Sequence, residues 1–352
     1  MPTNRHEVSA RSGGSVLLLA LWALLFLGMV AVSVSSYVSM HMDAAWSLAD
    51  RSVCRHAAKA GVEAAIGEVC RGTNAWAALD QSWGEPGSAL DKVGVGDGVF
   101  TVFHVEPGEG GSIVTNCGLA DEERKININA ITNNAACRDV VRALFETAGG
   151  VDSVTAENIT ACIADWIDGD DQSREGGAEN GDYALRNPPY RCRNGRIGRI
   201  EELLLVNGVE TNILAGVAGY LTVYGTNGSV NVNTASPAVL RALANARKGT
   251  QTSDAEALVA RILEFRKAGK TVEDLDKRKI REALFGTGEL TSAEQGEWGV
   301  LEWLLNHRLI AVQSRHFCGI SAGQLLRGGS GEARIMFVYD GVTGNIERWD
   351  EY

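Results

Sequence analysis

One unbroken apolar segment near the beginning of the chain limits what this protein can be. From Val16 to Val34 no residue carries a charge, and Ser33 is the only polar side chain. As an α-helix this segment would be about 28 Å long, close to the thickness of the hydrocarbon core of a membrane. Charged residues stop at Arg11 and resume at Asp43. The segment therefore predicts one membrane-spanning helix.

The charges before this segment predict its orientation. Arg5 and Arg11 outnumber Glu7 on the short N-terminal side. Because cytoplasmic flanks carry an excess of Lys and Arg, we expect this end in the cytoplasm. The rest of the 352-residue chain is then expected on the opposite side of the membrane, held by one helix.

Three interpretations fit such a segment. A cleavable secretory signal with a small-residue site at Ala31–Ser33 would release a secreted enzyme that begins near Val34. A simple anchor would stay uncut. In the third interpretation, the basic leader that ends at Gly14, directly before Ser15, resembles the class III signal of type IV pilins and type II secretion pseudopilins. This resemblance implies that a prepilin peptidase cuts between Gly14 and Ser15 and leaves the helix in the membrane.

The fifth residue after this cleavage position is Leu19, and the apolar segment contains no acid. Most pilin-like helices have a glutamate at this position, which pairs with the N-terminal amine of a neighbouring subunit. An unpaired carboxylate in lipid is costly, so a subunit with no neighbour ahead of it gains nothing from one. Ser15–Trp22 is similar to the start of the K-type minor pseudopilins of type II secretion, which lack this glutamate and are assigned to the pseudopilus tip.

Strand patterns occur on both sides of a long, mostly helical stretch. The helical pattern of the membrane segment continues from Asp43 to Arg71. β-Branched and aromatic residues and an intervening turn then predict a hairpin from Val99–Val105 and Ser112–Asn116. Strands are predicted again only near the end of the chain, at Leu309–Ser314, Ala333–Tyr339 and Asn345–Trp349, with 316–325 as a less regular extended segment.

Two hairpins at opposite ends of a helical block would be too small to be stable separately, so we expect them in one body. The predicted fold is α+β: an N-terminal transmembrane helix continues into a small pilin-like α/β body, interrupted by a large inserted helical domain. The expected parts are a leader (1–14), the long helix (15–71), the first part of the body (72–125), the inserted helical domain (126–307) and the C-terminal strands (308–352).

The helical block contains an internal repeat. Lys125–Thr132 and Ser229–Ser236 share a paired-Asn pattern, and each is followed by two helices. These helices are predicted at Val140–Leu144 and Ala156–Trp166 after the first copy, and at Ala238–Leu243 and Ala255–Phe265 after the second. With Ile197–Gly208 between them, the copies resemble helix-hairpin-helix (SAM-like) modules, two of which also build the helical domain of the K-type family.

Helix-hairpin-helix modules can bind nucleic acid through glycine-containing hairpins and helix N-termini. The alternative function is therefore a membrane-tethered DNA-binding protein of a DNA-uptake system. The formal net charge of −11 and the lack of a basic cluster beside the hairpins argue against nucleic acid as the main partner. We therefore expect these modules to act as a scaffold.

The segment Asp165–Tyr183 carries seven carboxylates, whose mutual repulsion a cation would relieve. Asp168 and Asp170 match positions one and three of an EF-hand loop, and Glu179 falls at position twelve. Position six is Ser173 rather than glycine, so the loop is not an EF-hand. From spacing alone, a Ca²⁺ site and a solvated acidic loop both stay open.

The order of residues in this segment also resembles the K-type family, some of whose members bind calcium in the helical domain. The resemblance favours Ca²⁺, with Asp168, Asp170 and Glu179 as first ligands. Asp171 and Asp182 are second candidates. Asp165 is an alternative cap for the end of its helix, and Asn180 stands where an acid is common.

No pattern in the sequence predicts catalysis. Gly319–Gly323 has the spacing of a nucleophile elbow, but no histidine follows His316 to complete a triad. Gly94–Gly98 leads into a predicted strand, so it is not a dinucleotide-binding loop. The seven cysteines lack zinc spacing, and their pairing is not predicted.

The resemblance implies a minor pseudopilin at the tip of the type II secretion pseudopilus that initiates its assembly and supports protein export. The implied location is the inner membrane, single-pass, with most of the chain in the periplasm. The implied partners are the I- and J-type minor pseudopilins, other pseudopilus and inner-membrane components, and the prepilin peptidase.

Overall fold

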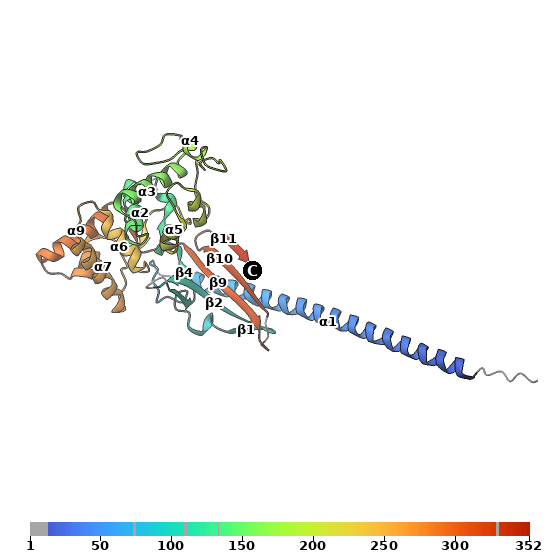
Figure 1. The fold of residues 1–352 in the computed structure, drawn as a ribbon. Coiled ribbons are helices and arrows are strands. Elements are labelled where there is room, and N and C mark those ends of the chain that lie inside the picture. The colour runs from blue at the N-terminus through green and yellow to red at the C-terminus, as the bar shows by residue number, and fades with distance from the viewer. Residues whose placement is uncertain (1–12, 73–74, 109–111, 133, 329–330) are drawn as a thin grey trace, which may run out of the picture.

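The computed structural model describes residues 13–72, 75–108, 112–132, 134–328 and 331–352. Helix α1 (Gly13–Arg71) is a single continuous helix that extends far beyond a body of sheet and helices (Figure 1). Residues 1–12 of the predicted leader lie outside the described residues, and the predicted cleavage position falls at the start of α1. The first part of α1 is long and apolar enough to cross a membrane, and none of its apolar window is buried among the described residues. The prediction of an N-terminal apolar helix suited to a single-pass anchor is confirmed.

The second part of α1 packs on one face of a seven-stranded antiparallel sheet. The order of the main path is β1-β2-β9-β10-β11, while β3 pairs with β2 and β4 pairs with β9. The strands are β1 (Val93–Val95), β2 (Gly98–Pro107), β3 (Ile113–Cys117), β4 (Ala120–Asp121), β9 (His316–Leu325), β10 (Glu332–Asp340) and β11 (Ile346–Glu351). Strands from both ends of the sequence thus form one sheet, and the predicted α+β class is confirmed.

Small residues allow α1 to lie close to the sheet. A Cβ atom on Gly323 would lie 2.1 Å from the carbonyl oxygen of Cys54, and one on Gly61 would lie 2.2 Å from Ser321 Oγ. Ser321 is fully buried and its hydroxyl donates to the carbonyl oxygen of Ala58 at 2.7 Å. The serine of the elbow-like motif therefore serves helix–sheet packing.

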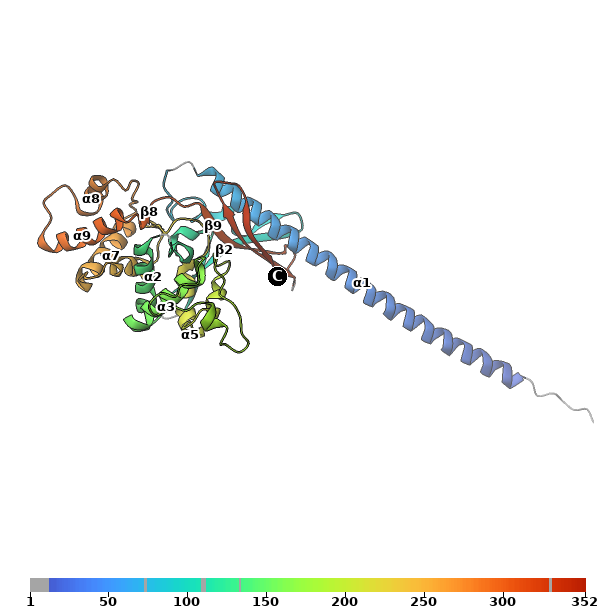
Figure 2. The ribbon, with the colours of Figure 1, turned by 90° about the horizontal axis from the view of Figure 1, so that it is seen from above.

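The helices lie beyond the end of the sheet that is farthest from the free part of α1 (Figure 2). They are α2 (Ala135–Thr147), α3 (Ser153–Ile167), α4 (Asn180–Tyr183), α5 (Thr211–Val217), α6 (Pro237–Ala246), α7 (Thr252–Lys267), α8 (Lys277–Phe285) and α9 (Ser292–Asn306). Several begin with side-chain caps: Asn134 accepts from the N–H of Ala136, and Ser236 precedes Pro237 at the first position of α6.

The two copies of the repeated segment make the same contacts. The side chain of Asn129 accepts from the N–H of Ile197 at 2.8 Å and donates to its carbonyl oxygen at 3.0 Å. Asn233 makes the same pair of bonds with Val272, both at 2.9 Å. Each copy also begins with a two-residue strand in a parallel pair. In the first copy β5 (Ile126–Asn127) pairs with β6 (Leu221–Thr222), and in the second β7 (Val230–Asn231) pairs with β8 (Ile310–Ala311).

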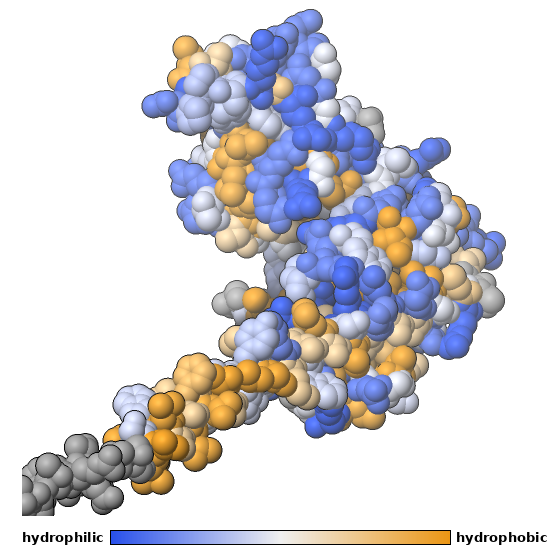
Figure 3. Space-filling view, turned by 90° about the vertical axis from the view of Figure 1, so that its right-hand side faces the viewer, coloured by the Kyte–Doolittle hydropathy of each residue, from blue (hydrophilic) through white to orange (hydrophobic). Residues whose placement is uncertain are grey.

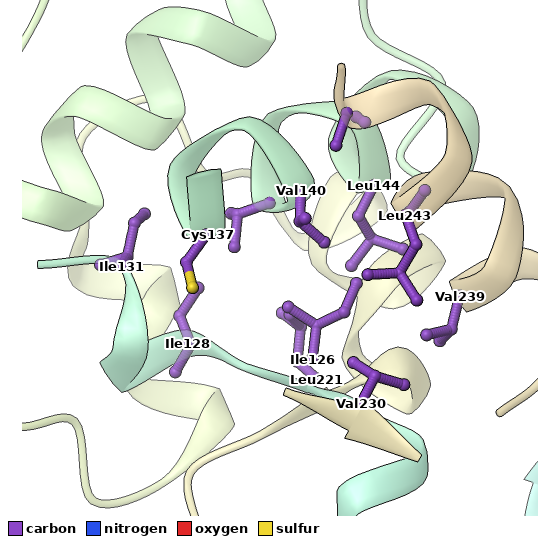
Figure 4. Close-up of a cluster of buried hydrophobic side chains, with 14 of the residues drawn as sticks. Ile126, Ile128, Ile131, Cys137, Val140, Leu144, Leu221, Val230, Val239 and Leu243 are labelled. Carbon is purple, nitrogen blue, oxygen red and sulfur yellow. The ribbon is translucent and has the colours of Figure 1, made fainter. Parts of the chain in front are cut away.

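Side chains of both copies share one apolar core (Figure 4). Val140 and Leu144 on α2 lie beside Val239 and Leu243 on α6, above Leu221. All five are at most 3% exposed. The helical block is therefore packed as one unit rather than as two separate modules.

Buried polar contacts connect this block to the sheet. The Asp121 carboxylate at the end of β4 is fully buried and accepts from the hydroxyls of Ser314 and Thr234 and from the Asn231 amide. Burial raises the pKa of Asp121. We call this contact region, where the chain leaves the sheet after β4 and returns before β9, the neck.

Two sequence-based expectations need correction. The strand predicted at Leu309–Ser314 is only β8, and it pairs with β7 in the helical block instead of the main sheet. The segment 316–325, expected as less regular, is the ten-residue strand β9, which pairs with β2, β4 and β10. Its two glycines weaken the strand pattern because neighbours pack closely on them: α1 lies against Gly323, and the Leu119 side chain lies against Gly319.

The acidic segment 168–179, expected as a loop, contains no regular helix, and the segment 197–208 between the two copies contains a 3₁₀ helix, η5 (Ile200–Leu205).

Candidate metal centre

The acidic loop follows α3 and is held by an aromatic cluster at its base. Asp152 caps the start of α3 by accepting from the N–H groups of Val154 and Thr155. At its other end, the Trp166 ring lies edge-on to Tyr183, with 4.9 Å between ring centroids, and near Tyr190 at 6.2 Å. The loop 168–179 is thus fixed at both ends by packed side chains.

Three of the predicted ligands come together in this loop. Asp168, Asp170 and Glu179 each place one carboxylate oxygen within 4.8 Å of the oxygens of the other two. Glu179 is buried, Asp168 is half-buried and Asp170 is exposed. The group therefore forms a cluster of oxygen atoms that is open to solvent on one side.

Glu179 is the carboxylate of the cluster that a bound cation would stabilise most. It is 5% exposed, and neither of its carboxylate oxygens has a hydrogen-bond partner of good geometry among the described residues. Burial and the negative charges of Asp165 and Asp168 raise the pKa of Glu179 to about 7. Asp168 Oδ1 is also buried without a partner. Unpartnered buried carboxylate oxygens are unfavourable unless a proton or a metal ion occupies the position between them.

Arg174 neutralises the other side of the cluster. Its guanidinium bonds Asp165 Oδ1 at 2.5 Å and also contacts Asp168 Oδ2. Its main-chain N–H donates to Asp165 Oδ2 at 3.1 Å. Asp168 therefore presents one oxygen to Arg174 and the other to the cluster.

Asp165 belongs to the support of the loop. It is fully buried, and its carboxylate binds Arg174 rather than capping the end of α3. Gly177 packs so closely that a Cβ atom there would lie 1.9 Å from Asp165 Oδ2. The alternative role of Asp165 as a helix cap is therefore wrong: the structure uses it to anchor the loop.

The two second-choice ligands lie outside the cluster in other roles. Asp171 Oδ1 accepts from the side-chain amides of Asn180 at 2.5 Å and Asn194 at 3.4 Å. Asp182 Oδ2 accepts from the N–H of Glu179 at 2.9 Å, as a residue of the first turn of α4. The structure thus separates Asp171 and Asp182 from the three clustered carboxylates.

The donor set fits a hard cation. Ca²⁺ prefers six to eight oxygen ligands from carboxylates, carbonyls and water, and tolerates irregular geometry. Asp168 Oδ1, one oxygen of Asp170 and Glu179 would supply the protein ligands, and the exposed side would admit water. The role of Arg174 was not predicted from the sequence. Its signal is that it is the one basic residue among the seven carboxylates of Asp165–Tyr183.

Comparisons with known proteins agree with the resemblance found in the sequence. Residues 124–226 match the family model described as type II secretion system (T2SS), protein K. The chain is 28% identical over 165 residues to type II secretion system protein K of Pectobacterium carotovorum subsp. carotovorum, which covers 44% of each protein. It is 28% identical over 128 residues to the protein K of Klebsiella pneumoniae, covering 34% of this chain and 39% of that protein.

The fold is also similar to a solved structure. A chain in the crystal structure of the GspK-GspI-GspJ complex from the enterotoxigenic Escherichia coli type 2 secretion system aligns with a TM-score of 0.60. The alignment covers 90% of this chain and 99% of that chain at 18% identity. The sequence matches span less than half of the curated relatives, whereas the fold similarity spans nearly the whole chain. The predicted resemblance to the K-type minor pseudopilins is confirmed.

Proposed function

We propose that this chain is a K-type minor pseudopilin of a type II secretion system, located at the tip of the pseudopilus, where it initiates assembly and supports protein export. The observation that carries this proposal is the combination of two features (Figure 1). The free part of α1 is apolar, exposed and without acids, and the helical block between β4 and β9, which we call the head, forms a wide opposite end. The role is structural rather than catalytic.

The free part of α1 suits a subunit with nothing ahead of it. Outside the body, α1 carries mostly apolar side chains (Figure 3). Leu19 is 69% exposed, and no carboxylate lies between Ser15 and Met42 to pair with the amine of a preceding subunit. Such a helix can pack in the membrane against subunits that follow. It lacks the carboxylate that would pair with the N-terminal amine of a subunit ahead of it.

The head supports a terminal position for steric reasons. It lies beyond the sheet, on the side away from the free part of α1, so it widens the end of the molecule (Figure 2). We infer that it is an inserted domain of two helix-hairpin-helix-like repeats, because Asn129 and Asn233 make matching bonds in the two copies. The head would obstruct a further subunit added to the fibre ahead of this one.

The proposed location is the inner membrane, with the body and head in the periplasm. The proposed partners are the I- and J-type minor pseudopilins, since the similar fold comes from a GspK-GspI-GspJ complex. The prepilin peptidase and the remaining pseudopilus and inner-membrane components are proposed from the same family. We further propose that Ca²⁺ binds Asp168, Asp170 and Glu179 and holds the acidic loop.

The first experiment is N-terminal sequencing of the protein extracted from membranes. Cleavage after Gly14 predicts a mature chain that begins at Ser15 and stays in the membrane fraction. A soluble chain that begins near Val34 would contradict the proposal and favour a secreted protein.

The second experiment tests the tip position in cells that lack the chromosomal copy of this gene. The unaltered chain and a Leu19→Met control should both restore secretion and pseudopili. Leu19→Glu should impair both, because it places an unpaired carboxylate in the membrane at the end of the fibre. Equal activity of Leu19→Glu and Leu19→Met would argue against a subunit that has no neighbour ahead of it.

A further inference from the structure

A second cluster of metal-binding side chains lies at the neck, apart from the acidic loop. His316 at the start of β9, Asp340 at the end of β10 and Glu347 in β11 each place one ligand atom within 4.8 Å of the other two. His316 and Asp340 are at most 2% exposed, while Glu347 is exposed. This cluster contains an imidazole nitrogen, unlike the all-oxygen cluster of the acidic loop.

Glu123, in the 3₁₀ turn η3 (Glu122–Arg124), fixes the orientation of the His316 ring. Its Oε1 lies 2.7 Å from His316 Nδ1, and its Oε2 accepts from the main-chain N–H of His316 at 3.1 Å. With the Nδ1 proton donated to Glu123, Nε2 presents its lone pair on the other side of the ring. There it faces Glu347 Oε1 at 3.6 Å. A lone pair directed at a carboxylate is repulsive unless a cation lies between them.

Asp340 adds a fixed negative charge beside this position. Its carboxylate accepts from the Arg315 guanidinium, from the N–H of Val342 at 2.8 Å and from the Thr343 hydroxyl at 2.7 Å. Oδ2 accepts from Arg315 and the Thr343 hydroxyl, and Oδ1 from Arg315 and main-chain N–H groups, so Asp340 acts mainly as a fixed negative charge next to the cluster. Three carboxylates and one guanidinium surround the imidazole, so the neutral ring leaves two excess negative charges, which one divalent cation would balance.

We propose that His316 Nε2 and Glu347, assisted by Asp340, bind a first-row divalent cation such as Zn²⁺, with Glu123 as the residue that positions the imidazole. A metal-binding histidine that donates its other N–H to a carboxylate is the usual arrangement in protein zinc sites. Mixed nitrogen and oxygen ligands favour Zn²⁺ and its neighbours, whereas the acidic loop offers oxygen alone.

The position of this site links it to the neck. The residues around it come from η3, where the chain leaves the sheet, and from β9, β10 and β11, where the sheet is completed. Tyr224, from the helical block, places its ring 6.5 Å from the His316 ring. A bound ion would therefore hold β9, β10 and β11 together where the chain returns from the helical block, and would reach η3 through the contact between His316 and Glu123.

A proton is the competitor for the same nitrogen. Burial alone would lower the pKa of His316, but Glu123, Glu347 and Asp340 together raise it. Because Zn²⁺ and a proton bind the same lone pair, the affinity for Zn²⁺ is expected to rise with pH.

The test uses the full-length chain in detergent, without a histidine tag and with Ca²⁺ in excess to saturate the acidic loop. Zn²⁺ stoichiometry is measured by competition with a chromophoric chelator. Glu347→Gln should lose one equivalent of Zn²⁺ or bind it at least about tenfold more weakly, and His316→Gln should do the same. Because the seven cysteines are present in every variant, the difference from the parent reports this site alone.

The matched control is Glu302→Gln, which alters an exposed carboxylate paired with Lys277 and should leave Zn²⁺ binding unchanged. If His316→Gln fails to fold, Glu347→Gln still decides, because its side chain is at the surface. Equal Zn²⁺ stoichiometry and affinity in the parent and Glu347→Gln, or loss of Zn²⁺ in Glu302→Gln to the same extent, would overturn the proposal.

Discussion

The two copies of the paired-Asn motif have the same inner contacts but different outer ones. In each copy the second asparagine bonds both main-chain groups of a distant residue, Ile197 for Asn129 and Val272 for Asn233. The first asparagine differs. Asn127 donates to carbonyl oxygens of Tyr224 and Gly225 within the block, whereas Asn231 donates to Ala77 O, to Ser314 Oγ and to Asp121 in the neck.

The loops of the two copies differ in the same way. The first copy carries the acidic loop between α3 and η5, and the second copy has a shorter connection there, at 268–276. One copy is thus built around a candidate metal centre, and the other is attached to the sheet. The contacts that both copies share determine the shape of the head. The residues outside these contacts give each copy its own role.

The largest expected effect comes from the contacts that the copies share. Asn129→Ala or Asn233→Ala leaves a buried N–H and a buried C=O unpaired, so each should lower the free energy of unfolding of the head by about 2–4 kcal/mol. Chemical denaturation of the detergent-solubilised chain measures this. Asn245→Ala, which loses one exposed bond to Arg241, is the control and should cost less than about 1 kcal/mol. Very unequal losses at 129 and 233 would contradict the equivalence of the copies.

The acidic loop should give the first copy a pH dependence of its own. In the absence of Ca²⁺, folded Glu179 keeps its proton up to about pH 7, whereas the unfolded chain releases it near pH 4.5. The folded state thus binds more protons within this window, and the free energy of unfolding should fall as pH rises through it, by up to about 3 kcal/mol. Denaturation at a series of pH values checks this, and Glu179→Gln should flatten the component. A Glu179→Gln profile identical to the parent would exclude Glu179 as its source.

Calcium should reverse that loss. At a concentration one hundred times its Kd, Ca²⁺ should add about 2.7 kcal/mol to the free energy of unfolding at pH 7 or above. EGTA should remove this gain, as should Glu179→Gln, while Glu175→Gln, at an exposed acid of the same loop, should retain it. Isothermal titration calorimetry and thermal unfolding measure the effect. Retention of full Ca²⁺ affinity in Glu179→Gln would remove Glu179 from the ligand set.

The smallest expected effect separates a cap from a ligand. Asp182→Ala removes the acceptor for the N–H of Glu179 and should cost about 1 kcal/mol of stability. Because Asp182 lies outside the cluster, the affinity for Ca²⁺ should change by less than about threefold, a difference of under about 1 kcal/mol. Calorimetry on this variant beside Asp168→Asn makes the comparison direct. A loss of affinity in Asp182→Ala as large as in Asp168→Asn would return Asp182 to the candidate ligands.

Local patterns predicted those parts of the fold whose residues are neighbours in sequence. The β-branched and aromatic residues of Val99–Val105 predicted β2, and the unbroken apolar segment with the helical pattern after it predicted α1. Strand β9 was underestimated because its glycines serve long-range packing, Gly323 against α1 and Gly319 against Leu119, and no local pattern reveals these contacts. Spacing grouped Asp168, Asp170 and Glu179 correctly in space.

Residues that meet over long sequence separations were beyond such patterns. Asp121 and Ser314 bond across 193 positions, as do Glu123 and His316. Arg174 pairs with Asp165 and Asp168 only because the loop folds back on α3, so its role depends on the tertiary structure.

Helix α1 has a mechanical consequence. It contains 59 residues without proline or interruption, which corresponds to a length of about 88 Å. A stiff rod of this length acts as a lever: a tilt of about 5° at one end displaces the other by roughly 8 Å. The close contacts at Gly61 and Gly323 hold the second part of α1 against the sheet. A change in the tilt of the membrane-spanning part would therefore move the sheet and the head together as one rigid unit.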